Sequence, residues 1–221
     1  MAKKVAINWT TGLIRETFKI DKKGEDFPLL VRWLDVQNDL TTDEISLLEK
    51  RRRKLLPNVQ GWNEETLKMK FIALILDMVD YDSEMYQGVY EAELSAVVKN
   101  YALKVITDFT VAKVTDDFIQ HPYLYFHEYK PKKRTKDPVG QVLLASVIAQ
   151  ELNKDEKPIY GCVVFGELWH FMVLHGSEYA MSDGFRATNA DDLQKILLIL
   201  RKFKDILYNE LVPQKSAPSV F

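Results

Sequence analysis

The stretch YLYFHEYKPKKR, residues 123–134, has the pattern of a β-strand that is rich in aromatic residues and ends in a charged pair. Side chains alternate between the two faces of a strand, so two apolar residues and then Glu128 and Lys130 share one face. An ionised group on a buried face costs several kcal/mol unless it is paired. Glu128 and Lys130 are therefore either a salt bridge at the end of a strand or part of a metal site.

The composition is ordinary for a globular protein and excludes several classes. The chain has 221 residues, of which 47% are hydrophobic and 28% charged, enough for one full domain with a smaller appendage. A net charge of −2 excludes a general polycation, so any contact with nucleic acid would need a local basic patch. Cys162 is the only cysteine, and no apolar run approaches the ~18 residues that a membrane span requires. These features predict a cytoplasmic protein without a membrane segment.

The first 58 residues are predicted to form a small α+β appendage. Two β-rich runs, at 4–9 and 13–20, are separated by a polar turn sequence and favour a hairpin. Further along, Thr41 and Glu44 have the spacing of a capping box, which predicts the start of a helix.

Residues 59–212 predict an α/β (α+β) domain with a central mixed β-sheet flanked by helices, followed by a flexible tail at 213–221. Apolar residues at three- and four-residue spacing predict the helices, and β-rich runs predict the strands. The predicted helices are 63–80, 138–153 and 190–211, and the predicted strands lie within 89–114, 123–130, 159–165 and 168–174.

Five polar residues occupy positions where these patterns predict an apolar side chain. Glu64 falls on the apolar stripe of the first of these helices, and Gln141 falls near the start of the stripe of the second. Asp108 lies within a strand, where aspartate is disfavoured. Glu128 and Lys130 follow on the next strand. Each has an ordinary explanation taken singly; for Glu64 this is an acid in the first turn, favoured by the helix dipole.

Taken together, the five residues follow the order helix Glu, strand Asp, strand Glu-x-Lys, helix Gln. This order resembles the signature of the PD-(D/E)XK nuclease-like superfamily, with residues 128–130 as the (D/E)XK half and Asp108 as the isolated aspartate. Thr107 stands where that signature usually has proline.

Longer stretches carry a closer resemblance. The helix that bears Glu64, Lys68, Ile72 and Leu76 is similar to the first helix of the nuclease domain of type I restriction motor subunits. The segments WNEETLKMKFI, FHEYKP, DPVGQ and PIYGCVVFGELWHFMVL resemble a family of uncharacterised bacterial proteins, and the similarity spans residues 40–207.

The resemblance implies a restriction-endonuclease-like fold and a metal-dependent endonuclease that hydrolyses DNA in restriction or defence. It implies that Glu64, Asp108 and Glu128 hold Mg²⁺ or Mn²⁺, because these ions prefer hard oxygen ligands. It also implies that Lys130 stabilises negative charge beside the attacking water and that Gln141 orients the lysine or the water.

The basic loop after this strand would contact the phosphate backbone next to the site. Its residues are Lys132, Lys133, Arg134 and Lys136. The expected partner is therefore nucleic acid, DNA in the first place, and the chain would act alone, as a homodimer or as a subunit of a larger complex. Two alternatives stay open: a nuclease-fold protein that binds nucleic acid or a protein partner without cutting, and a purely structural Glu128–Lys130 pair. In the second case Glu64, Asp108 and Glu128 would not converge.

Overall fold

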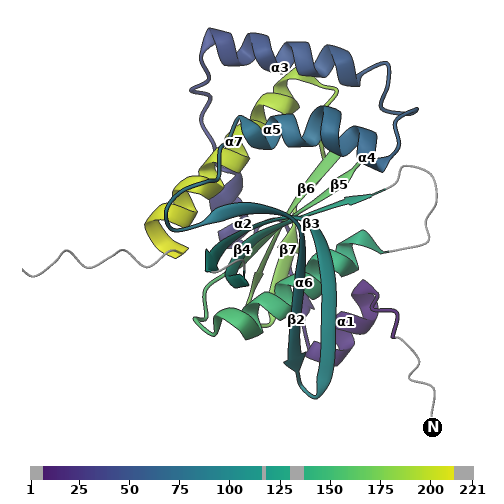
Figure 1. Ribbon diagram of the computed structural model, residues 1–221, viewed down its shortest axis with the longest axis vertical. Coiled ribbons are helices and arrows are strands. Elements are labelled where there is room, and N and C mark those ends of the chain that lie inside the picture. The colour runs from purple at the N-terminus through teal and green to yellow at the C-terminus, as the bar shows by residue number, and fades with distance from the viewer. Residues whose placement is uncertain (1–6, 116–117, 130–136, 212–221) are drawn as a thin grey trace, which may run out of the picture.

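The computed structural model describes residues 7–115, 118–129 and 137–211, with the backbone alone described at 114–115 and 118–129. Within these residues the chain forms a sheet of eight strands with helices on both faces (Figure 1). The strands are β1 (Asp21–Lys22), β2 (Gln87–Val98), β3 (Tyr101–Thr115), β4 (Phe118–Tyr129), β5 (Ile159–Phe165), β6 (Leu168–His175), β7 (Glu178–Met181) and β8 (Phe185–Arg186). The helices are α1 (Thr11–Phe18), α2 (Pro28–Leu34), α3 (Thr42–Leu55), α4 (Glu64–Leu67), η1 (Lys68–Ile72), α5 (Ala73–Asp77), α6 (Pro138–Asn153), α7 (Ala190–Ile206) and η2 (Leu207–Leu211).

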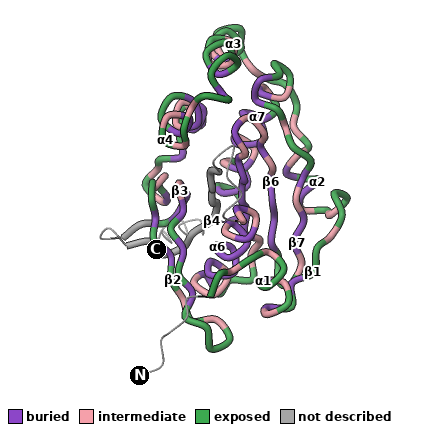
Figure 2. Tube along the Cα trace, turned by 90° about the vertical axis from the view of Figure 1, so that its right-hand side faces the viewer, coloured by how far each residue is buried: buried purple, intermediate pink, exposed green. Residues whose placement is uncertain are grey.

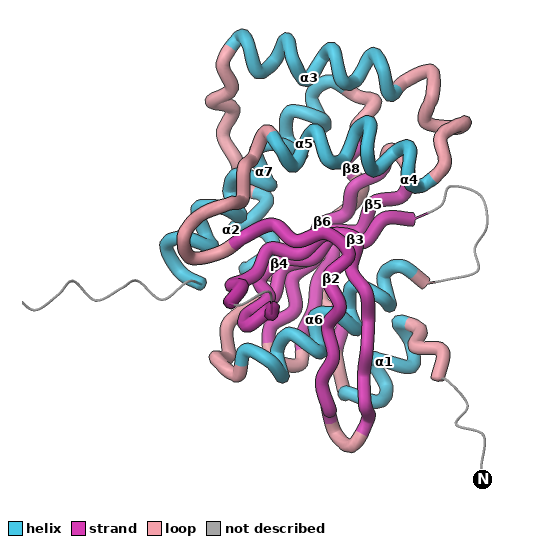
Figure 3. The backbone as a smooth tube through the Cα atoms, viewed as in Figure 1, coloured by secondary structure: helices cyan, strands magenta, loops and turns pink. Residues whose placement is uncertain are grey.

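The sheet is mixed, and its strands follow the order β1-β7-β6-β5-β4-β3-β2, with β8 paired to β6. Strands β2, β3 and β4 are antiparallel neighbours, and the β2–β3 hairpin extends beyond the rest of the sheet (Figure 3). Strand β4 pairs in parallel with β5, and helix α6 connects the two. The predicted mixed sheet with flanking helices is thus confirmed.

Two hydrophobic cores lie on the two faces of this sheet. One contains α2, α3, α7 and the continuous helix α4–η1–α5, and the other contains α1 and α6 (Figure 1). The central strand β5 supplies both: Cys162 and Val164 belong to the first core, and Ile159 and Val163 to the second. A strand covered on both faces is apolar along its length. Accordingly, buried positions gather in β6, α6 and α7 at the middle of the molecule (Figure 2).

The predicted N-terminal hairpin is wrong, because residues 11–18 form helix α1 and residues 7–9, the described part of the first run, form no strand. Thr10 caps the helix, with its hydroxyl oxygen accepting a hydrogen bond from the Leu13 backbone N–H at 3.3 Å. Ile14 and Phe18 are four residues apart and are both buried in the core that α6 shares. Their helical spacing, combined with a partner surface on α6, outweighs the β-propensity of the run.

The segment predicted as an appendage contributes side chains to the main cores. Leu30 and Trp33 of α2 are fully buried, and Leu48 and Leu55 of α3 pack in the same core as α7. The Trp33 indole N–H donates a hydrogen bond to the Ile199 carbonyl oxygen at 2.9 Å. In the part of the chain that is described, none of the helices is both long and apolar enough to cross a bilayer.

Candidate functional site

One row of side chains on the α4–η1–α5 helix faces the sheet above β3. Asn63 caps the helix as predicted, and its Oδ1 accepts a hydrogen bond from the Thr66 N–H at 2.9 Å. Lys68, Ile72 and Leu76 follow at four-residue spacing and are 7%, 5% and 4% exposed. The middle segment, η1, is a π-helix, whose i→i+5 hydrogen bonds widen the turn. A wider turn keeps residues four apart in line, so this row is buried beside Leu67, Phe71 and Ile75 of the predicted apolar stripe.

Asp108 lies at an irregular point of β3. The hydroxyl groups of Thr107 and Thr110 are both buried and are 2.5 Å apart. Residues three apart on a regular strand point to opposite faces, so this contact requires a departure from alternation between them. The consequence is that Asp108 and Phe109, although adjacent in sequence, both line the cavity beneath the helix.

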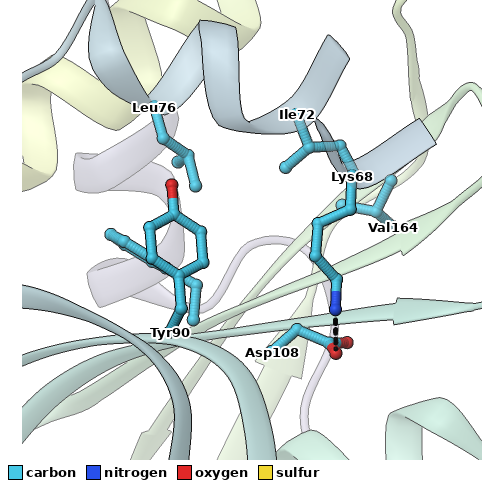
Figure 4. A pocket seen from close by; sticks show the side chains of 7 residues that line it. Lys68, Ile72, Leu76, Tyr90, Asp108 and Val164 are labelled. Atoms are coloured by element: carbon cyan, nitrogen blue, oxygen red, sulfur yellow. Dashed lines mark hydrogen bonds and ion pairs between the residues drawn. The ribbon is translucent and has the colours of Figure 1, made fainter. Parts of the chain in front are cut away.

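This cavity lies between the helix and strands β2, β3 and β5 (Figure 4). Its volume is about 10 Å³, which is room for about one water molecule. The lining residues are Lys68, Ile72, Leu76, Tyr90, Asp108, Phe109 and Val164. The Lys68 ammonium lies 3.0 Å from Asp108 Oδ1, as the dashed line in Figure 4 marks, and 3.4 Å from Glu65 Oε1.

The ion pair is the main electrostatic feature of this cavity. The side chain of Lys68 is 9% exposed and that of Asp108 is 20% exposed, whereas that of Glu65 is 68% exposed. Burial lowers the pKa of Lys68, but the hydrogen bond and the charge of Asp108, with the charge of Glu65, raise it more, so that the pKa lies above its usual 10.5. Lys68 therefore carries its positive charge at neutral pH.

The backbone brings two of the predicted acids toward the same region. Glu64 is half-buried and lies one turn before Lys68 on the same helix row. The Lys68 backbone N–H donates to the Glu64 carbonyl oxygen. On β4, Glu128 is the Cα partner of Val164, whose side chain lines the cavity. The position of the Glu128 side chain is outside what the structure describes.

The remaining predicted residues lie elsewhere or outside the described residues. Gln141 is in the first turn of α6, the helix that covers the other face of the sheet, and its backbone N–H donates to the Asp137 carbonyl oxygen at 3.0 Å. Residues predicted to act as the catalytic lysine and the phosphate-binding loop fall outside the described residues. They are Lys130, Lys132, Lys133, Arg134 and Lys136.

The cavity can be compared with the needs of a divalent cation. Mg²⁺ takes oxygen ligands and is commonly held by one or two carboxylates together with waters and substrate phosphates. Asp108 offers such an oxygen at the cavity, and Glu64 brings a second carboxylate to the same end of the helix. Among residues whose side chains are described, no three His, Cys, Asp or Glu come together as a metal-binding group. Among the described lining residues of the cavity, the carboxylate donor is thus that of Asp108, which is paired with Lys68.

Lys68 is the residue of this site to which the sequence pattern assigns no role. The sequence nevertheless contains a signal for it, because Lys68, Ile72 and Leu76 are spaced four residues apart. Ile72 and Leu76 are apolar, so a lysine at this position is as unexpected as Glu64. Comparison with protein-family models finds no match for the chain, and comparison with curated proteins finds none either.

Proposed function

We propose that this protein is a metal-dependent nuclease that hydrolyses phosphodiester bonds in DNA. The observation that carries the proposal is the Lys68–Asp108 pair in a cavity at the helix–sheet junction, next to the strand position of Glu128. Charged groups held at a cavity by burial and by a specific partner are typical of functional sites. The order of β2, β3, β4, α6 and β5, with β5 parallel to β4, agrees with the restriction-endonuclease-like fold that the sequence resemblance implies.

In this proposal the acids hold the ion and position it. Asp108, with Glu128 and Glu64, would supply oxygen ligands to Mg²⁺ or Mn²⁺. The bound ion would supply polarisation of a phosphoryl oxygen and activation of a water at neutral pH. Asp108 is positioned by the irregularity of β3, so its carboxylate would need little rearrangement on binding.

Lys130 would act on the substrate side and stabilise the charge that develops on the phosphate. Gln141 has no role in this proposal, because α6 covers the face of the sheet opposite the cavity. The basic residues at 132–136 would bind the DNA backbone without reading its sequence, so the affinity would fall with rising salt. We place this activity in the bacterial cytoplasm, in restriction or defence, with the chain acting alone, as a homodimer or within a larger complex.

A second candidate is a nuclease-fold protein that binds nucleic acid or a protein partner without cutting. One observation favours it: a lysine ammonium already neutralises Asp108, which is the carboxylate that the described residues place at the cavity. In this case the ion pair would be a substitute for the metal.

A cleavage assay on plasmid and single-stranded DNA tests the proposal. We expect cutting with Mg²⁺ or Mn²⁺ that EDTA stops and that is lost in Asp108→Asn and Lys130→Ala. Asp183→Asn, an exposed aspartate in the loop after β7, is the matched control and should cut like the wild type. Folded protein that binds DNA but never cuts it would favour the second candidate. Cutting that survives Asp108→Asn would contradict the proposed site.

A further inference from the structure

Two irregularities in regular elements meet at the Lys68–Asp108 pair. The π-helix η1 begins at Lys68, and β3 departs from alternation at the residues around Asp108. π-Turns and strand irregularities are less favourable than the regular structures that they interrupt, and both occur preferentially at functional sites. The local backbone on both sides is therefore arranged to bring this ammonium and this carboxylate together.

The described side chains around the Lys68–Asp108 pair are mostly apolar. Ile72, Leu76 and Val164 line the cavity beside Lys68, and the acceptors of its ammonium are Asp108 and the largely exposed Glu65. Replacing a buried ion pair by apolar residues of similar volume is often neutral or stabilising. Methionine at position 68 together with leucine at position 108 would fill the same space without the desolvation of two charges, so stability alone does not account for the pair.

We propose that Lys68 is a positioning residue that occupies Asp108 while the site holds no metal, and that a divalent cation binds at Asp108 by displacing the Lys68 ammonium. The inference rests on the proposed function, because it assigns Asp108 to the metal. A second cation at the same carboxylate is repelled by the ammonium, so the two compete. The flexible four-carbon stem of lysine lets the ammonium move away while the helix stays in place.

This competition has a consequence for the substrate. In the described part of the site, the Lys68 ammonium faces the Asp108 carboxylate. Once a divalent cation has replaced Lys68 at Asp108, the site carries additional positive charge, which favours a polyanionic substrate such as the DNA backbone. Lys68 thus lowers the affinity for the metal in the absence of DNA and adds a cation to the loaded site.

Binding of Mn²⁺, measured by electron paramagnetic resonance of the free ion, tests the inference without any cleavage. We expect Lys68→Met to bind Mn²⁺ about tenfold more tightly than the wild type. Asp108→Asn and the double variant Lys68→Met/Asp108→Asn should lose this binding. Lys70→Met is the matched control, because Lys70 is an exposed lysine two residues further along the same helix, and its affinity should equal that of the wild type.

A second measurement uses the wild type alone and applies even where Lys68→Met does not fold. Acetylation of lysines, followed by mass spectrometry, reports how accessible each ammonium is. Lys68 is 7% exposed, so its labelling should be slow without metal and should rise when Mn²⁺ is added. Labelling of Lys70 should not change. Unchanged protection of Lys68 at saturating Mn²⁺ would overturn the inference.

The outcomes separate this inference from the proposed function. Tighter binding in Lys68→Met that depends on Asp108 supports the competition even where no DNA is cut. Binding that is unchanged or weaker in Lys68→Met but lost in Asp108→Asn overturns the competition and leaves the metal site of the proposed nuclease intact. Absence of Mn²⁺ binding in every variant, the wild type included, overturns both.

Discussion

The Lys68 ammonium and the Asp108 carboxylate each lose most of their contact with water and gain each other as partners. Whether the pair stabilises the fold depends on the balance between the lost hydration and the gained attraction. At 3.0 Å the attraction is strong, but the desolvation of two charges beside Ile72 and Val164 opposes it. Losing one partner leaves the other charge partly buried and unpaired, whereas losing both removes the desolvation as well. The two kinds of substitution should therefore have very different effects on the free energy of unfolding.

We expect Lys68→Met to lower the free energy of unfolding by roughly 2–3 kcal/mol, below the usual range for a buried pair because Asp108 keeps 20% of its side-chain exposure. The double variant Lys68→Met/Asp108→Leu should recover most of that loss. Urea unfolding of Lys68→Met, of Asp108→Leu and of the double variant measures the coupling energy between the two residues. As a control, Lys104→Met removes a pair with Glu93 whose side chains are 60% and 53% exposed, and it should change stability by less than ~0.5 kcal/mol. A double variant as unstable as the sum of the single variants would contradict this account.

At the scale of single residues, the sequence showed that Asp108 is an unexpected residue on a strand, but it did not indicate that Lys68 is its partner. Asp108 in a strand indicated a polar requirement, and the structure meets it with Lys68. The spacing of apolar residues placed Leu74 and Met78 on the buried face of the helix, yet both are only half-buried, and the row of Lys68 takes their place. The reason is the π-helix, which depends on packing against the sheet and has no local sequence signal.

Among the elements, helix α3 shows what local sequence can predict well. Thr41 Oγ1 accepts a hydrogen bond from the Glu44 backbone N–H at 3.3 Å, and Glu44 Oε2 accepts one from the Thr41 N–H at 2.8 Å, so the predicted capping box is confirmed. Glu44 also pairs with Arg201 of α7, a contact between residues far apart in sequence that no local pattern indicates. The carboxylate thus joins the start of one helix to the side of another.

The pH dependence of stability should report on this carboxylate. The hydrogen bond from Arg201, followed by that from the Thr41 N–H, lowers the pKa of Glu44 from 4.5 to about 2 in the folded protein. Because the folded pKa is the lower one, the ionised form favours folding, and this stabilisation is fully present above pH 4.5 and is lost as the pH falls through 2. Glu44→Gln should therefore lower stability by about 1 kcal/mol at pH 7, where both groups are partly exposed and screened.

Thermal unfolding followed by circular dichroism at several pH values from 7 down to 2 checks this expectation. The difference between Glu44→Gln and the wild type should shrink as the carboxylate of the wild type is protonated. Asp43→Asn, in the same helical turn with an exposed side chain, is the control. A difference that stays constant down to the lowest pH would show that the hydrogen-bond geometry, and not the charge, is what matters.

The elements that agree with the predictions are the long helices and the hairpins with clear turn residues, whereas a short segment does not agree. The long helices and the β5–β6 hairpin lie close to the predicted ranges, and the β2–β3 turn falls at Lys99-Asn100, whose φ angles are 46° and 72°. Two positive φ angles are typical of the two-residue turns that join antiparallel strands. The short N-terminal run failed, because eight residues with mixed propensity take the structure that their neighbours favour.

At the scale of the whole molecule, the sheet separates two cores, and the N-terminal segment takes part in both. Ile14 and Phe18 belong to the core beneath α6, whereas Leu30 and Trp33 belong to the core beneath α7. The Trp33 ring packs edge-on against Tyr160 of β5, with the ring centroids 5.0 Å apart. A sequence pattern reveals that residues are apolar but not which face of a distant sheet they cover, so the boundary of an appendage cannot be drawn from it.

Removal of residues 1–58 tests how far the remaining chain depends on them. The truncated chain would expose the partners of Trp33 on β5 and α7, and we expect it to lack both cooperative urea unfolding and a near-ultraviolet circular dichroism spectrum of fixed aromatic rings. In the full-length chain, Trp33→Ala should cost about 4 kcal/mol, the usual loss for a buried tryptophan. Val31→Ala, on the same helix but 48% exposed, should stay within ~0.5 kcal/mol of the wild type. A truncated chain that unfolds cooperatively with native aromatic signals would show instead that residues 59–221 fold independently, because the sheet and α7 would then close their core without α2.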